Sequence, residues 1–249
     1  MSAPGIAKRI NRRQLVIAGA ALGAASLAAT DLAFAGSYGS GDLGPWEGLS
    51  RAISTEDQIE RVVATNGVYM FGDSISVQDG KALALRLLSR TGAQLAVNNW
   101  SGRPTEPAVD VLEHWASVYG LPRRILMATG SNDVFDPPRF ATQVGRTMQL
   151  AGPERMVCWV NVQVCRRKQT MAVQLADQRN SAWINLQLSD AQKQHPNLRI
   201  IHWAEFLAVK PARLAMYLVD GVHTSVPAGQ DTRNELIVQA LAGSAVPAK

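Results

Sequence analysis

The sequence predicts an α/β fold in which a parallel β-sheet is covered by helices on both faces. Short apolar runs alternate with longer amphipathic segments, and several of the runs end in glycine or small polar residues. Hydrophobic residues make up 47% of the 249 residues and charged residues 18%, which excludes a disordered chain and a protein with many membrane spans. The two cysteines exclude a disulfide-dense scaffold.

The elements of this fold follow one another along the chain. Apolar, β-rich runs predict five strands, at 68–71, 94–98, 124–128, 156–164 and 198–202. Apolar residues at helical spacing predict helices at 79–91, 107–119, 138–150, 171–194 and 232–241. Ligands bind at the carboxyl ends of the strands in such sheets, so we expect the chemistry just after each strand.

The first 35 residues predict an export signal. A basic region ending in Arg12 and Arg13 precedes the uncharged residues 14–30, and residues 33–35 spell an A-x-A cleavage site. The paired arginines resemble those of a twin-arginine signal. An anchor that stays attached is the alternative, although the uncharged stretch is short for a membrane span. We expect a periplasmic, cell-wall or extracellular bacterial protein that touches the membrane only transiently, through this segment.

The net charge of +5 would suit a nucleic-acid-binding protein, but the charges are not where such a protein needs them. Residues 1–35 carry +3 of the total, which leaves +2 for residues 36–249. We therefore expect no nucleic-acid partner. Residues 36–65 are interpreted as a leader and a lead-in helix, and residues 66–249 as the main domain.

Ser74 is the first candidate catalytic residue. It belongs to Gly72-Asp73-Ser74, directly after the first predicted strand and at the start of a helix. A nucleophile in that position lies near backbone N–H groups that can stabilise an oxyanion. The alternative is that Ser74 or Ser76 is only an N-cap for that helix, because Asp and Ser are ordinary turn and cap residues.

Two further candidates follow the second and third strands. Gly102 can bring its N–H close to a ligand, and Asn132 can donate its side-chain amide to an oxyanion. The alternative for Gly102 is an ordinary loop glycine, and the alternative for Asn132 is an Asx turn. Near the C-terminus, Asp220 and His223 lie three residues apart in a loop, so the carboxylate can hold one imidazole nitrogen while the other faces a serine.

Other catalytic patterns are absent from the sequence. It contains no G-x-S-x-G elbow, H-E-x-x-H motif or P-loop. His114, His195 and His202 are scattered, so we predict no metal site.

Taken in order, these blocks resemble the SGNH hydrolases, a branch of the GDSL esterases, over residues 68–241. Ile75 stands where the older motif has Leu. The resemblance implies a three-layer, flavodoxin-like fold and an acyl-ester hydrolase or transferase that needs no cofactor. It also implies roles for five residues: Ser74 as nucleophile, His223 as general base, Asp220 as its orienting partner, and Ser74, Gly102 and Asn132 as the oxyanion hole.

The substrate is suggested by a looser similarity. Residues 197–203 and 218–223 are similar to the SGNH domains of bacterial polysaccharide and peptidoglycan O-acetyltransferases, with His202 where those often have Asp. We expect an esterase for short acyl groups, above all acetyl, on an envelope carbohydrate. A lipid esterase or general carboxylesterase is the alternative. An alternative from another functional class is that the protein is a non-catalytic SGNH-like module that binds glycan.

Two features after the fourth strand stay open. Arg166, Arg167 and Lys168 lie on the expected ligand side and could bind an anionic substrate, or they could be a solvated loop. A disulfide between Cys158 and Cys165 would require that strand to end early and fold back, because residues seven apart in an extended strand lie about 20 Å apart.

Overall fold

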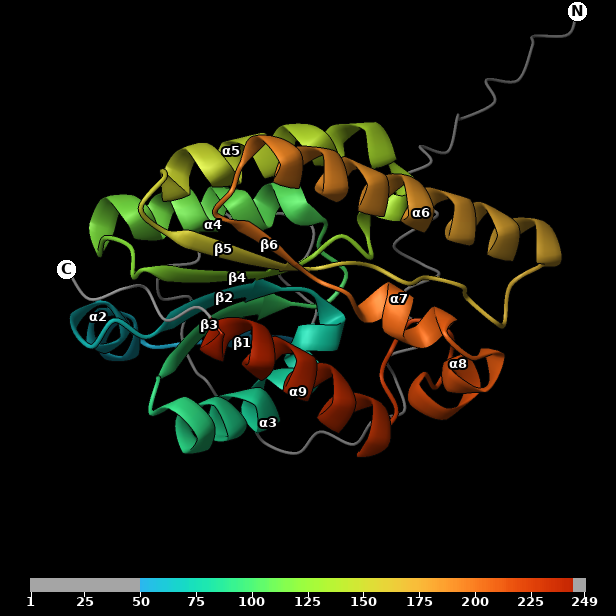
Figure 1. Ribbon diagram of the computed structural model, residues 1–249, viewed down its shortest axis with the longest axis horizontal. Helices are drawn as coiled ribbons and strands as arrows, with labels where there is room; N and C mark the ends of the chain where they lie inside the picture. Colours follow the sequence, from blue (N-terminus) through green and yellow to red (C-terminus); the bar gives the residue numbers. More distant parts are fainter. Residues whose placement is uncertain (1–49, 244–249) are drawn as a thin grey trace, which may run out of the picture. The chain divides into compact units, whose positions relative to one another are not determined.

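The computed structural model describes residues 50–243, so the predicted export signal lies outside the described residues. In this range, a six-stranded sheet of order β1-β3-β2-β4-β5-β6 lies between two layers of helices (Figure 1). The strands are β1 (Arg51–Ile53), β2 (Val68–Gly72), β3 (Leu95–Trp100), β4 (Arg124–Ala128), β5 (Met156–Val160) and β6 (Leu198–Ile201). Neighbouring strands are parallel except β1 and β3, which are antiparallel. The predicted fold class is confirmed.

The helices form two groups around this sheet. Helices α4, α5 and α6 cover one face, and α3 and α9 cover the other (Figure 1). The α-helices are α2 (Glu56–Ala64), α3 (Ser74–Thr91), α4 (Thr105–Val118), α5 (Phe140–Ala151), α6 (Met171–Gln194), α7 (Trp203–Ala208), α8 (Pro211–Tyr217) and α9 (Ala228–Ala242). Two short 3-10 helices, η2 (Asp133–Phe135) and η3 (Pro137–Arg139), follow β4.

Alternate residues of the central strands enter two separate cores. On β2, Tyr69 and Phe71 pack on the α4 face around Trp115, while Met70 packs on the α3 face with Leu83. Both faces of the strand are buried, which explains why it appears in the sequence as a continuous apolar run.

The strand predicted at 156–164 is shorter in the structure. β5 ends at Val160, and β6, its neighbour, ends at Ile201. Beyond that point the backbone takes its partners from α6: Asn185 contacts both the N–H and the carbonyl of Val162, and Ser181 accepts from the N–H of Val164. Side-chain partners satisfy this segment where the sheet has ended.

Both cysteines are free thiols. Cys158 is buried in β5, whereas the sulfur of Cys165 contacts Gln174 and Gln178 of α6. β5 does end between the two cysteines, yet the chain after it turns toward α6, so the disulfide left open by the sequence is not formed.

The strand β1 was not predicted. At three residues it is too short to show an alternating pattern, and it lies within the segment interpreted as leader and lead-in helix, together with α2. The helix predicted at 79–91 begins earlier, at Ser74, and the one predicted at 232–241 begins at Ala228.

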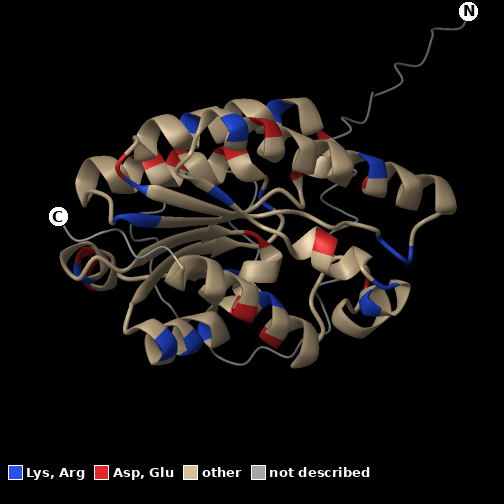
Figure 2. Ribbon diagram, viewed as in Figure 1, with Lys and Arg blue, Asp and Glu red and all other residues tan. Residues whose placement is uncertain are grey.

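Acidic and basic residues are interspersed along the helices on both sides of the sheet (Figure 2). Among the described residues, no helix combines the length and the apolar character that crossing a membrane requires.

We predict that Trp115→Ala lowers the free energy of unfolding by about 3–5 kcal/mol, as expected for loss of a large core side chain. The indole is fully buried and makes edge contacts with Tyr69 and Phe71, with ring centroids 4.8 and 5.1 Å away. Urea unfolding followed by circular dichroism measures the change. Trp183→Ala is the matched control, because Trp183 is 47% exposed and its loss should cost within about 0.5 kcal/mol. Equal losses for the two variants would contradict this description of the core.

Candidate active site

The structure joins Ser74, His223 and Asp220 by two successive hydrogen bonds. Ser74 Oγ lies 2.8 Å from His223 Nε2, and His223 Nδ1 lies 2.8 Å from Asp220 Oδ2. A carboxylate can only accept hydrogen bonds, so Nδ1–H donates to Asp220 and Nε2 is left to accept from the serine hydroxyl. This is the arrangement in which an imidazole can take a proton from a hydroxyl.

Ser74 owes its position to the turn between β2 and α3. Asp73 is the N-cap of α3, and its Oδ1 accepts from the N–H of Ile75 at 3.0 Å. Ser74 is therefore the first helical residue, and its N–H belongs to the turn whose N–H groups have no acceptor within a helix. The N-cap is thus Asp73 and neither Ser74 nor Ser76, and the Ser74 hydroxyl is directed at His223.

The loop of His223 is shaped by Asp220. Its Oδ1 accepts from the backbone N–H groups of Val222 and His223, at 2.9 and 2.8 Å, while Oδ2 holds the imidazole. Gly221 has a φ of +93°, and a Cβ at this position would overlap the carbonyl oxygen of Cys165. A glycine is therefore required for the tight turn that brings carboxylate and imidazole together.

The surroundings of the pair raise the pKa of His223 and lower the pKa of Asp220. Burial acts to lower the pKa of His223, but the hydrogen bond and charge of Asp220, with the charges of Asp73 and Asp79, raise it above 6.5. Burial acts to raise the pKa of Asp220, yet the hydrogen bonds from His223 and Val222 bring it well below its ordinary value. Asp220 is thus a carboxylate at neutral pH and stabilises a proton on His223.

Gly102 and Asn132 lie on the loops after β3 and β4. Gly102 has a φ of +79°, and Asn132 directs its Nδ2 to the carbonyl oxygen of Arg103 at 3.2 Å. The structure thus links the loops of the second and third sequence blocks next to Gly102.

Two buried contacts that the sequence did not indicate tie these loops to the nucleophile. The hydroxyl of Ser131, which precedes Asn132, donates to the carboxylate of Asp73, which precedes Ser74. The side chain of Arg103, only 2% exposed, donates from Nε to the carbonyl oxygen of Gly72 at 3.1 Å. The loops carrying Ser74, Gly102 and Asn132 are therefore connected through their immediate neighbours.

Burial affects the charges of these connecting residues. It lowers the pKa of Arg103 to about 9, although the charge of Asp73 acts in the opposite direction. Burial raises the pKa of Asp73 despite the Ser131 hydrogen bond and the charge of Arg233. Arg103 also donates to the side-chain and backbone oxygens of Asn98, so the guanidinium joins its loop to the ends of β2 and β3.

The sequence also did not indicate the role of Asp133. It follows Asn132 and accepts from the N–H and the hydroxyl of Thr105, at 3.0 and 2.8 Å to Oδ2. Thr105 is the first residue of α4, and Pro104 before it makes no side-chain cap. Asp133 caps α4 from another loop. Burial raises its pKa to about 7, against the effect of the Thr105 hydrogen bonds.

The three basic residues after β5 have different surroundings. Arg166 makes a two-pronged ion pair with Asp177, at 2.9 and 2.8 Å, and stacks on Phe135. Arg167 donates from its side chain to the carbonyl oxygen of Leu214. Lys168 is exposed. The first two support the structure around the site, and substrate contact by any of the three stays a prediction.

Within residues 50–243, no group of three or more His, Cys, Asp and Glu side chains is arranged to hold a metal ion. His202, which replaces the expected Asp before Trp203, lies 3.4 Å from Glu205 and is largely exposed.

No protein-family model matches the chain, and no curated protein matches its sequence. Several solved structures match its fold. The C-terminal catalytic domain of peptidoglycan O-acetyltransferase A from Streptococcus pneumoniae, solved with a methylsulfonyl adduct, matches with a TM-score of 0.55 and 19% identity, over 71% of this chain and 93% of that one.

Two lipases give similar values. The lipase/acylhydrolase from Enterococcus faecalis has a TM-score of 0.58 and 21% identity, over 74% of this chain and 98% of that one. A GDSL-like lipase from Bacteroides thetaiotaomicron has 0.57 and 15%, over 77% and 92%. The predicted likeness in fold to GDSL and SGNH hydrolases, and to the catalytic domain of an O-acetyltransferase, is confirmed.

We predict that Asp220→Asn lowers the pKa of His223, because the carboxylate that raises it is lost while burial remains. An NMR titration of the imidazole measures this pKa. The wild-type value should lie above 6.5, and the variant value should be lower. His114→Gln is the control, since His114 belongs to α4 whereas Asp220 and His223 lie on the loop between α8 and α9, and its removal should leave the His223 titration unchanged. An unchanged His223 pKa in Asp220→Asn would contradict the electrostatic role of Asp220.

Proposed function

We propose that this protein is a serine esterase that hydrolyses carboxylic esters, with Ser74 as nucleophile, His223 as general base and Asp220 as the orienting carboxylate. The observation that carries the proposal is the unbroken hydrogen-bond chain from Ser74 Oγ through the imidazole to Asp220, with both distances at 2.8 Å. The likeness of this fold to those of lipases and acylhydrolases supports the same reaction type.

The proposed reaction has two halves. Ser74 Oγ attacks the ester carbonyl carbon while His223 Nε2 takes the hydroxyl proton, and that proton then passes to the leaving alcohol. Water attacks the resulting acyl-serine by the same route, with His223 again as base, and releases the acid. Asp220 stabilises the imidazolium formed in each half.

The oxyanion hole is proposed to consist of the N–H groups of Ser74 and Gly102 and the side-chain amide of Asn132. The position of Ser74 at the start of α3 adds the partial positive charge of a helix N-terminus. The bond from Asn132 Nδ2 to the Arg103 carbonyl orients the amide beside the Gly102 loop, and one amide hydrogen remains for the substrate.

The favoured substrate is a short acyl ester, above all acetyl, on an envelope or other carbohydrate. The likeness to the catalytic domain of a peptidoglycan O-acetyltransferase supports this proposal, as does the predicted export. An esterase for lipids or general carboxylic esters is the second candidate, supported by the likeness to the Enterococcus lipase/acylhydrolase.

Ser74→Ala should abolish hydrolysis of p-nitrophenyl acetate and labelling by a fluorophosphonate probe, because no other hydroxyl replaces the attacking oxygen. Both are measured on purified, folded protein. Ser76→Ala is the matched control, since this buried neighbouring serine should be dispensable for labelling. Near-normal turnover by Ser74→Ala would refute the proposal, and wild-type protein that folds but neither labels nor hydrolyses any ester would favour a glycan-binding module.

Asn132→Ala should lower kcat by about 10²–10³-fold, the usual effect of removing one oxyanion donor. KM should change little, because the interaction develops mainly in the transition state. Steady-state kinetics with p-nitrophenyl acetate measure both constants. A loss in KM alone would contradict a role in the oxyanion hole.

The acyl and alcohol groups can be separated by one screen. Acetylated xylan, O-acetylated peptidoglycan and p-nitrophenyl esters of increasing chain length are compared with the wild type and Ser74→Ala. Activity that is highest for acetyl and present on a polymer supports the carbohydrate substrate. A rise in kcat/KM with chain length would favour the lipid or general esterase instead.

A further inference from the structure

Helix α3 contacts the His223 loop a second time, one turn after Ser74. The side-chain amide of Gln78 donates to the carbonyl oxygen and to Oγ1 of Thr224, at 2.9 and 2.8 Å. The hydroxyl of Thr224 donates in turn to the carboxylate of Asp79, at 2.9 and 3.1 Å. Thr224 directly follows His223, so one helix carries the nucleophile and also holds the neighbour of the base.

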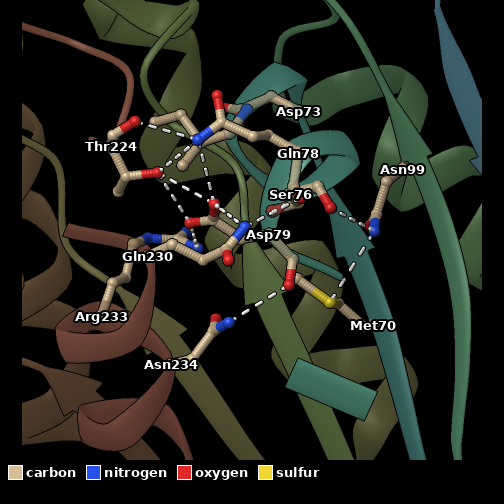
Figure 3. A network of polar contacts seen from close by, with 11 residues as sticks. Met70, Asp73, Ser76, Gln78, Asp79, Asn99, Thr224, Gln230, Arg233 and Asn234 are labelled. Atoms are coloured by element: carbon tan, nitrogen blue, oxygen red, sulfur yellow. Dashed lines mark hydrogen bonds and ion pairs between the residues drawn. The ribbon is translucent and has the colours of Figure 1, made fainter. Parts of the chain in front are cut away.

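This contact is buried within a larger polar cluster (Figure 3). Thr224 is 1% exposed and Asp79 is fully buried. From α9, Gln230 donates to the carbonyl oxygen of Gln78 and to Asp79, and Asn234 donates to the carbonyl oxygen of Asp79. Leaving a buried carboxylate short of donors is costly, so the cluster favours one arrangement of Thr224.

The hydrogen bonds of Asp220 and Gly221 in this loop do a different task. The hydrogen bonds of Asp220 lie within the loop, so they orient the imidazole relative to its own backbone. The backbone N–H groups of Cys165 and Arg167 donate to Gly221 and Asp220 and attach the loop to the segment after β5. Neither set fixes the loop relative to α3.

The spacing along α3 matches this task. Ser74 and Gln78 are four residues apart, so they lie on the same side of the helix, about 6 Å apart along its axis. They contact the consecutive residues His223 and Thr224. The helix thereby holds the base at two adjacent points.

We propose that Thr224, held by Gln78 and Asp79, is a positioning residue that sets the separation between Ser74 Oγ and His223 Nε2. This inference rests on the proposed esterase function, in which that separation governs proton transfer. Misplacing reacting groups by about 1 Å can cost on the order of a hundredfold in rate. The effect of losing Thr224 should therefore appear in kcat.

The first test compares Thr224→Val with Thr224→Ser in the full-length protein. The valine keeps the branched shape and removes the hydroxyl, and kcat for p-nitrophenyl acetate should fall by about 10–100-fold with KM changed less than about twofold. The serine restores the hydroxyl and should recover most of the wild-type kcat. Assays are run well below the unfolding temperature of each variant, so that a stability loss alone leaves kcat unchanged.

Two further variants separate positioning from general loosening. Gln78→Met removes the amide donors from the helix side and should also lower kcat, which keeps the test available if Thr224→Val does not fold. Arg86→Gln is the control: Arg86 also joins α3 to α9, through ion pairs with Asp231 and Glu235 at 2.6 and 3.1 Å, and its loss should leave kcat unchanged. Unchanged kcat in Thr224→Val, equal losses in the serine and valine variants, or an equal loss in Arg86→Gln would overturn the proposal.

Crystal structures test the geometry without any substrate, so the proposal can be judged even if the esterase function fails. In Thr224→Val, or in Gln78→Met if the valine variant does not fold, the distance from Ser74 Oγ to His223 Nε2 should exceed hydrogen-bond range. In Arg86→Gln it should stay at 2.8 Å. A distance of 2.8 Å retained in the first variant would overturn the positioning role, whatever the activity.

Discussion

The parallel arrangement of β2 to β6 is the constraint on which the whole site depends. Parallel strands end at a common edge, so the loops that follow them meet there although they are far apart in the sequence. The loop that carries His223 follows α8, and it reaches this edge to contact Ser74, a residue 149 positions away. A single hydrogen bond contributes only about 1 kcal/mol net, so it cannot by itself hold such distant segments together.

Buried polar contacts complete what the sheet begins. Burying charged groups such as Asp73, Arg103 and Asp79 is unfavourable unless each finds partners, and here the partners lie on other segments of the chain. Satisfying them therefore fixes the loops against one another. The two hydrophobic cores on either side of the sheet stabilise the fold and so offset the cost of burying these charged groups.

The sequence predicted what local pattern and motif order can reveal. Apolar runs located the parallel strands, and the order of small motifs indicated Ser74, Asp220 and His223, which the structure brings into contact. The buried position of Arg103 could not be predicted, because arginines are usually exposed. Its acceptors, Gly72 and Asn98, lie on two different strands, and the residues around Arg103 in the sequence do not indicate these contacts. The end of β5 was equally hidden, because it depends on where β6 stops and not on the apolar residues of β5 itself.

The short strand β1 bears on the behaviour of the protein in concentrated solution. An uncovered strand edge offers free N–H and C=O groups to which a strand from another molecule can add. β1 occupies this edge of β3 along residues 98–100, and the N–H of Ser101 continues the pairing with the carbonyl oxygen of Ser50. With three residues, β1 is itself a poor template for a further strand. This side of the sheet is thereby protected from edge-to-edge aggregation next to the loop that carries Gly102.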